Sequence, residues 1–127
     1  MPKMVLDVGQ CAADHASIRR LVETHFDAEV QQSHLAADTL AALRQCAADL
    51  VLVNRKLDTN NRDGLEIIKQ IKADTSLPAT DCMLISNFAE HQAAAAAAGA
   101  EPGFGKAELG SASTLELLER YLGPRKN

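Results

Sequence analysis

Short apolar runs alternate with stretches of helical periodicity along the whole chain of 127 residues. The run at residues 50–53, LVLV, is continuously apolar, as expected for a parallel strand that is buried on both faces. The segment 65–74, LEIIKQIKAD, instead repeats its apolar side chains at helical spacing. This alternation predicts a parallel sheet covered by helices. We find no internal repeat and no linker, and therefore expect residues 1–127 to form one α/β domain.

The predicted architecture is a doubly wound (βα)5 domain with a five-stranded parallel sheet. The expected strands cover residues 3–8, 28–34, 49–54, 81–86 and 102–105. The expected helices begin at Asp14, cover 35–47 and 65–74, begin again at Ser86 or Asn87, and run from Ser113 to about Leu122. Asp14 could cap the first helix, and Gly99 suits the left-handed residue just beyond the alanine-rich helix. The partly alternating polarity of residues 28–34 favours a strand at the sheet edge.

The charge and composition of the chain exclude several classes of function. A formal net charge of −4 argues against binding to nucleic acid or to an anionic membrane, because both require a basic surface. No window approaches the ~18 apolar residues of a membrane span, and no secretion signal is recognisable, so we expect a cytoplasmic protein. No nucleophilic triad, glycine-rich phosphate loop or metal motif is present, and we do not expect an enzyme. Cys11, Cys46 and Cys82 are odd in number and lack CxxC spacing, which predicts buried, reduced thiols.

Polar side chains follow the expected strands at their carboxyl ends. They are Asp7 with Asp14 for the first strand, Asn54 for the third, Ser86 for the fourth and Lys106 for the fifth. The carboxyl ends of parallel strands meet at one edge of the sheet, where α/β proteins bind their ligands. A hydroxyl, an amine and an amide at that edge predict an oxyanion or phosphate site. The alternative is that each polar residue simply ends a strand.

Several segments resemble the receiver domain of two-component response regulators. DLVLVNRKLD followed by DGLEIIKQIK resembles the receiver segment in which the third strand ends at a phospho-accepting aspartate. CMLIS and AAAAGAEPGFGKAEL match later receiver segments in the same order, so the resemblance covers nearly the whole chain. It implies the flavodoxin-like receiver fold and a role in signal transduction as a response regulator of a phosphorelay.

The resemblance assigns a family role to several of the polar residues. Receivers carry an acidic pair after the first strand, an acceptor aspartate after the third, a Ser or Thr after the fourth and a lysine after the fifth. Ser86 matches the hydroxyl position, Lys106 matches the lysine, and Phe104 falls near an aromatic residue that changes rotamer when a receiver switches. The acceptor position holds Asn54, which implies a pseudo-receiver with a disabled acceptor. A neutral amide is a poor nucleophile, so Asn54 is expected to bond with Lys106 or with loop backbone instead.

The acidic pair of the family has two possible counterparts in this chain. Asp7 could be the first acid with Asp14 folded back as the second, or Val8 and Gly9 could occupy the acid positions while Asp14 only caps the helix. Asp7 and Asp14 are the candidate magnesium ligands. Magnesium requires several oxygen ligands, so the missing charge at the acceptor position predicts that it binds weakly and that no cofactor is needed.

Lys106 requires a new partner if the acceptor carboxylate is absent. Asp7, Asp14 and Asp58 could each supply a carboxylate. A salt bridge at this edge would hold the site in one state, and phosphorylation would then no longer be the input.

The residues support three hypotheses of function. In the first, the chain contacts a protein partner or forms a homodimer without phosphorylation, through residues of about 89–122, the surface that receivers use. In the second, a non-standard carboxylate such as Asp58 or Asp7 accepts the phosphoryl group. In the third, Lys106, Ser86 and the amide of the acceptor position bind a small anion without phosphoryl transfer. We adopt the first hypothesis as the prediction.

Overall fold

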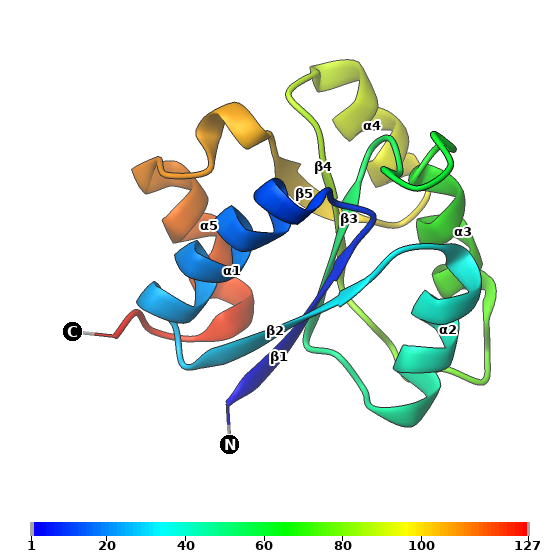
Figure 1. The fold of residues 1–127 in the computed structure, drawn as a ribbon, viewed down its shortest axis with the longest axis horizontal. Coiled ribbons are helices and arrows are strands. Elements are labelled where there is room, and N and C mark those ends of the chain that lie inside the picture. Colours follow the sequence, from blue (N-terminus) through cyan, green and yellow to red (C-terminus); the bar gives the residue numbers. More distant parts are fainter. Residues whose placement is uncertain (1, 127) are drawn as a thin grey trace.

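The computed structural model describes residues 2–126 and contains one parallel sheet with the strand order β2-β1-β3-β4-β5 (Figure 1). The strands are β1 (Lys3–Val8), β2 (Ala28–Ser33), β3 (Leu50–Asn54), β4 (Cys82–Ile85) and β5 (Glu101–Phe104). The helices are α1 (Ala12–His25), α2 (Ala36–Gln45), α3 (Leu65–Ala73), α4 (Ala89–Ala97) and α5 (Ala112–Leu122), with a short 3-10 turn η1 (Lys106–Glu108) before α5. The predicted doubly wound α/β fold is confirmed.

Strand β3 forms the centre of the sheet because its side chains are apolar on both faces. All 5 of its residues are buried, and it pairs with β1 on one side and with β4 on the other. Val8 of β1 lies level with Val53, and Ile85 of β4 lies level with Asn54. These registers bring the turn after β1 and the end of β4 next to Asn54.

Helices α1 and α5 cover one face of the sheet, and α2, α3 and α4 cover the other (Figure 1). Alternation along each strand supplies both cores. In β1, Val5 faces α1 and α5, whereas Leu6 and Val8 face the other three helices. Asp7 shares the face of Val5, which places its carboxylate beneath α1. Within residues 2–126, no helix has the length and apolar character needed to cross a membrane.

Two local predictions agree with the structure. Residues 28–34 were expected at the sheet edge, and β2 pairs with β1 alone. Gly99 adopts the left-handed conformation that was predicted for the end of the alanine-rich helix, with φ of 99°. Glycine is favoured there because it has no Cβ to oppose a positive φ.

Two helix starts differ from the prediction. Helix α1 begins ahead of Asp14, whose carboxylate contacts Lys106 and does not cap the helix. Helix α4 begins after Phe88, later than the predicted start at Ser86 or Asn87. The hydroxyl of Ser86 accepts a hydrogen bond from the backbone N–H of Phe88 at 3.3 Å, which holds the intervening residue in a turn.

The three cysteines are free and lie in three different environments. Cys82 is fully buried in β4, and burial raises the pKa of its thiol to about 11. Cys11 is half-buried just ahead of α1. Cys46 follows the last residue of α2 at the surface, so the prediction that it is buried is wrong.

Candidate functional site

The carboxyl ends of β3 and β4 frame a pocket of about 180 Å³. It is lined by Asn54, Ser86 and Lys106, which the sequence predicted to meet at this edge of the sheet. Asp7 and Asp14 do not line it. The remaining lining residues are Arg55, Lys56, Ile85, Asn87, Phe88 and His91.

Asn54 acts as a hydrogen-bond donor to the backbone at the base of the pocket. Its side-chain nitrogen Nδ2 donates to the carbonyl oxygen of Lys56 at 2.7 Å and to that of Gly9 at 3.1 Å. Of the two partners expected for this amide, the structure has loop backbone and not Lys106. The residue is only 9% exposed, so these bonds satisfy a buried polar group and tie the end of β3 to the turn after β1.

Gly9 occupies a position that favours glycine, chiefly because its backbone has a positive φ. Its φ is 79°, and a Cβ added there would lie 2.4 Å from Cδ2 of Leu57. The carbonyl of Gly9 also accepts a hydrogen bond from the backbone N–H of Asp58 at 2.9 Å. The turn after β1 is thus packed against the loop after β3, and it presents backbone rather than a carboxylate beside Asn54.

Asp7 is completely buried beneath α1, on the face of the sheet opposite to Val8. Its Oδ2 lies 2.7 Å from Nδ1 of His15, while its Oδ1 has no hydrogen-bond partner in the described part of the chain. Burial raises the pKa of Asp7 to about 6, and the hydrogen bond and charge of His15 oppose this shift. Sequence reasoning missed His15. Its spacing from Ile18 and Val22 places it on the buried face of α1, and this was the available signal.

Asp14 and Lys106 form an ion pair at the rim of the pocket. Nζ of Lys106 lies 2.7 Å from Oδ2 of Asp14, and the two side chains are 38% and 40% exposed. The hydrogen bond from Lys106 lowers the pKa of the Asp14 carboxyl. Asp7 and Asp14 therefore bond different side chains, His15 and Lys106. Across residues 2–126, no group of three or more His, Cys, Asp or Glu side chains is arranged to hold a metal ion.

Ser86 is engaged by a histidine that sequence reasoning also missed. Oγ of Ser86 lies 2.7 Å from Nδ1 of His91, in the first turns of α4. The ring of Phe88 meets that of His91 edge-on, with the ring centroids 5.2 Å apart. Phe88 is 59% exposed, so an apolar ring stands at the mouth of the pocket. Ser86 follows β4, and His91 lies in the first turn of α4. The two side chains meet because α4 begins after Phe88, which leaves a turn between them.

Phe104 is buried between the sheet and α5, with 4% of its surface exposed, and it lies level with Ile85. The aromatic side chain at this end of β5 is therefore part of the core.

Gly103 precedes Phe104 on β5. The side chain of Gln92 occupies the space next to Gly103, because its Oε1 accepts the N–H of Gly103 at 3.0 Å and its Nε2 donates to the carbonyl of Leu84 at 2.8 Å.

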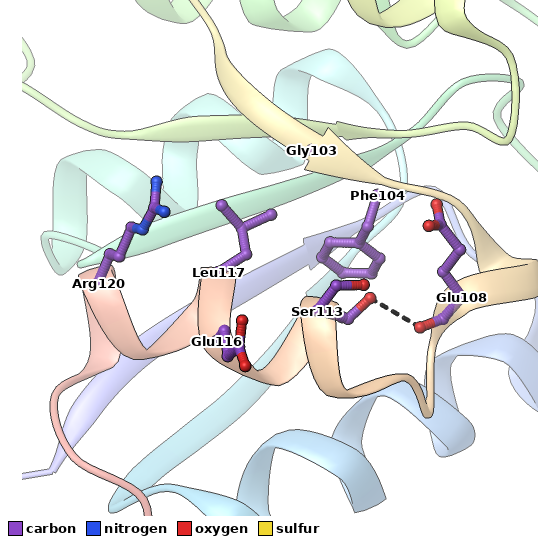
Figure 2. Close-up of a pocket in the computed structure, with 8 residues that line it drawn as sticks. Gly103, Phe104, Glu108, Ser113, Glu116, Leu117 and Arg120 are labelled. Carbon is purple, nitrogen blue, oxygen red and sulfur yellow. Dashed lines mark hydrogen bonds between the residues drawn. The ribbon is translucent and has the colours of Figure 1, made fainter.

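A groove of about 360 Å³ lies between β5 and α5, on the surface expected to contact a partner (Figure 2). Figure 2 shows Phe104 at its base and the side chains of Glu116, Leu117 and Arg120 along α5. The hydroxyl of Thr114 donates to the backbone carbonyl of Glu108 at 2.7 Å, the bond drawn as a dashed line. The groove thus combines an apolar floor with charges of both signs.

Comparisons with known proteins agree with the architecture. No family model and no curated protein matches the sequence. The receiver domain (CheY-like) of a response regulator from Methylobacillus flagellatus superposes with a TM-score of 0.76 at 18% identity, over 96% of this chain and 99% of that chain. The chemotaxis response regulator CheY4 of Vibrio cholerae gives 0.74 at 18% identity, over 96% and 100%. NtrX from Brucella abortus gives 0.72 at 24% identity over 96% of this chain, which spans 27% of NtrX. The chain therefore has the receiver-domain fold.

Proposed function

We propose that this chain is a receiver-type signalling module that acts through contact with a protein partner and does not accept a phosphoryl group. It has no enzymatic activity of its own in this proposal. The observation that carries the proposal is the pair of hydrogen bonds from Nδ2 of Asn54 to the carbonyls of Gly9 and Lys56. They make the family's acceptor position a structural donor, and the receiver fold supplies a framework for regulation by contact.

The chemistry of this position supports the proposal. Phosphorylation of a receiver requires a carboxylate oxygen that attacks phosphorus and remains bonded to it as an acyl phosphate. The amide of Asn54 is neutral, and its nitrogen donates hydrogen bonds but is not basic. Val8 and Gly9, which lie beside it, bring no carboxylate for magnesium, whose preferred ligands are oxygen atoms. Lys106 is already paired with Asp14.

The non-standard acceptors fit the site less well. Asp7 is completely buried and bonded to His15, so a phosphoryl donor has no direct access to it. Asp58 is exposed on the loop after β3 and does not line the pocket that holds Ser86 and Lys106. Neither carboxylate is therefore placed where these two side chains would stabilise phosphoryl oxygens.

The proposed contact surface comprises α4, β5 and α5, residues 89–122. Helix α4 exposes several alanine side chains, and alanine loses no rotamer freedom when a surface is buried. Phe88, at the start of α4, is the large apolar side chain that the described residues expose. The adjoining groove carries Glu116 and Arg120, which suits a protein partner with complementary charges.

Intact-mass measurement after incubation with magnesium and acetyl phosphate tests the proposal. The native chain should gain no magnesium-dependent adduct under conditions that fully phosphorylate a receiver domain with an aspartate acceptor. A magnesium-dependent mass increase on the native chain would overturn the proposal. Peptide mapping would then identify the labelled carboxylate, with Asp58 and Asp7 as the first residues to inspect.

A further inference from the structure

Strand β2 forms a free edge of the sheet, where backbone groups point away from β1. Successive residues of a strand direct their N–H and carbonyl groups toward opposite sides. The carbonyl of Ser33 faces β1 and accepts a hydrogen bond from the turn that follows it. The alternate residues Ala28, Val30 and Gln32 therefore point their groups outward, where no strand lies within residues 2–126. Such a row of backbone groups is able to pair with another strand.

The carboxylate of Glu23 occupies the middle of this edge. Its Oε2 accepts the N–H of Val30 at 2.9 Å, at the place where a carbonyl of a further strand would bind. Its Oε1 accepts a hydrogen bond from Nε of Arg19, one turn earlier on α1, at 3.2 Å. The hydrogen bond from Val30 is the largest cause of a lowered pKa of Glu23. The ionised carboxylate thus ends the hydrogen bonding of the sheet at β2.

A groove of about 480 Å³ lies beside residues 28–31 of β2. Arg19, Glu23 and Lys126 line it with charges of both signs. The charges of Arg19 and Lys126 both act to lower the pKa of Glu23, so both cations attract its carboxylate. A carboxylate that released the N–H of Val30 would therefore still lie among cations. The groove gives an incoming strand access to the edge without leaving Glu23 unpaired.

A second copy of this chain fits the edge, because β2 is self-complementary around Val30. A two-fold axis at Val30 pairs the two strands antiparallel, with the N–H and carbonyl of this residue bonded to the same residue of the other copy. Ala28 then lies opposite Gln32, and Glu29 lies opposite Gln31. Neither pair opposes like charges, and the carboxylate of Glu29 can accept a hydrogen bond from the Gln31 amide.

We propose that the outer edge of β2 is a strand-pairing surface for a second copy of this chain, and that Glu23 holds it closed. Pairing would join two five-stranded sheets into one continuous sheet. Glu23 must release the N–H of Val30 before a second strand binds, so its side chain sets the oligomeric state at this edge. The inference is independent of the proposed function, whose contact surface includes β5 at the opposite end of the sheet.

Sedimentation velocity of the native chain and its variants, over a series of protein concentrations, tests this surface. Glu23→Ala should dimerise about tenfold more tightly than the native chain, or more, because it frees the N–H of Val30. Glu23→Gln should behave as the native chain does, since an amide oxygen still accepts that N–H. Glu66→Ala is the charge-matched control, because Glu66 is exposed on α3 and pairs with Lys69. It should leave the association unchanged.

A second substitution tests whether the dimer forms through β2. Adding Gln32→Pro to Glu23→Ala should abolish the gain in association, because proline removes an outward N–H and leaves the bonds to β1 in place. Circular dichroism checks that each variant is folded. Hydrogen exchange needs no proline: the N–H of Val30 in Glu23→Ala should exchange more slowly as the protein concentration rises.

Three results would each overturn the strand-pairing surface. They are a Glu23→Ala protein that associates no more than the native chain, a folded double variant that still dimerises, and exchange at Val30 that is independent of concentration. Species larger than a dimer would also overturn it, because each chain has a single β2. Association through α4, β5 and α5 would appear equally in the native chain and in every variant, so the comparison separates it from pairing at β2.

Discussion

Nδ2 of Asn54 lies 3.1 Å from the carbonyl oxygen of Gly9, and this hydrogen bond joins the end of β3 to the turn that follows β1. The same nitrogen donates to the carbonyl of Lys56 at 2.7 Å. A carboxylate cannot donate either bond, and two carbonyl oxygens would face its negative charge. The pocket is therefore built around an amide, and an aspartate in its place would be unfavourable for the native structure.

Asn54→Asp should destabilise the protein, although the two side chains have nearly the same shape. Both donated bonds are lost and a buried charge faces two carbonyl oxygens, at a cost of about 1–3 kcal/mol in the free energy of unfolding. Urea denaturation at neutral pH measures this difference. Asn87→Asp is the matched control, because Oδ1 of Asn87 accepts the N–H of Ala107 at 3.1 Å and aspartate keeps that acceptor. Equal stability of Asn54→Asp and the native chain would contradict the donor role of the amide.

Asn54→Asp should also fail to restore phosphorylation by acetyl phosphate. An acceptor carboxylate needs a divalent cation beside it, and the neighbouring chain offers Val8 and Gly9 where oxygen ligands are required. Intact mass after incubation with magnesium should show no adduct on this variant. An adduct on Asn54→Asp alone would mean that Asp7 or Asp14 can still reach the metal, despite their bonds to His15 and Lys106 in this structure.

Gly9→Ala should destabilise the protein, because Gly9 lies in a buried turn with a positive φ. The new Cβ would meet the side chain of Leu57 at 2.4 Å, and a φ of 79° is strained for alanine, so we expect a loss of about 1–3 kcal/mol. Gly110→Ala provides the comparison, because no atom lies within 4 Å of a Cβ at that position. Its effect should stay within about 0.5 kcal/mol. Similar losses for the two variants in urea denaturation would show that the packing of Gly9 against Leu57 is unimportant.

The fold could be predicted because each element has its own periodicity. The apolar run of β3 indicates burial on both faces, and the alternating polarity of β2 favours an edge, so local patterns predicted the positions of these two strands but not the order of the whole sheet. The residues that end strands were also predictable. Asn54, Ser86 and Lys106 meet in one pocket because the carboxyl ends of parallel strands lie together.

The partners of these residues could not be predicted in the same way. His91 reaches Ser86 only because α4 begins after Phe88, and helix starts are poorly determined by sequence pattern. The choice of Lys106 between several carboxylates depended on how the segment after β1 enters α1. The backbone at Gly9 has a positive φ that brings Leu57 into contact, and this close approach is a tertiary feature that no local pattern encodes.

Asp7 should make the stability of the protein depend on pH in a definite direction. Burial raises the pKa of its carboxyl from 3.8 to about 6, so the folded protein favours the neutral acid. The stabilising contribution is then fully present below about pH 3.8 and is lost as the pH rises through about 6. Asp7→Asn keeps a neutral side chain beside His15 at every pH. The free energy of unfolding of the native chain, relative to this variant, should therefore fall between about pH 4 and about pH 6.

Urea denaturation of both proteins at several pH values across this window measures the difference directly. Asp58→Asn serves as the control, because the side chain of Asp58 is exposed on the loop after β3 and its removal should leave the pH dependence of the native chain unchanged. If the native chain instead gains stability relative to Asp7→Asn as the pH rises, the prediction that burial raises the pKa of Asp7 is wrong. That result would mean that attraction between the ionised carboxylate and His15, 2.7 Å away, outweighs the cost of burying the charge.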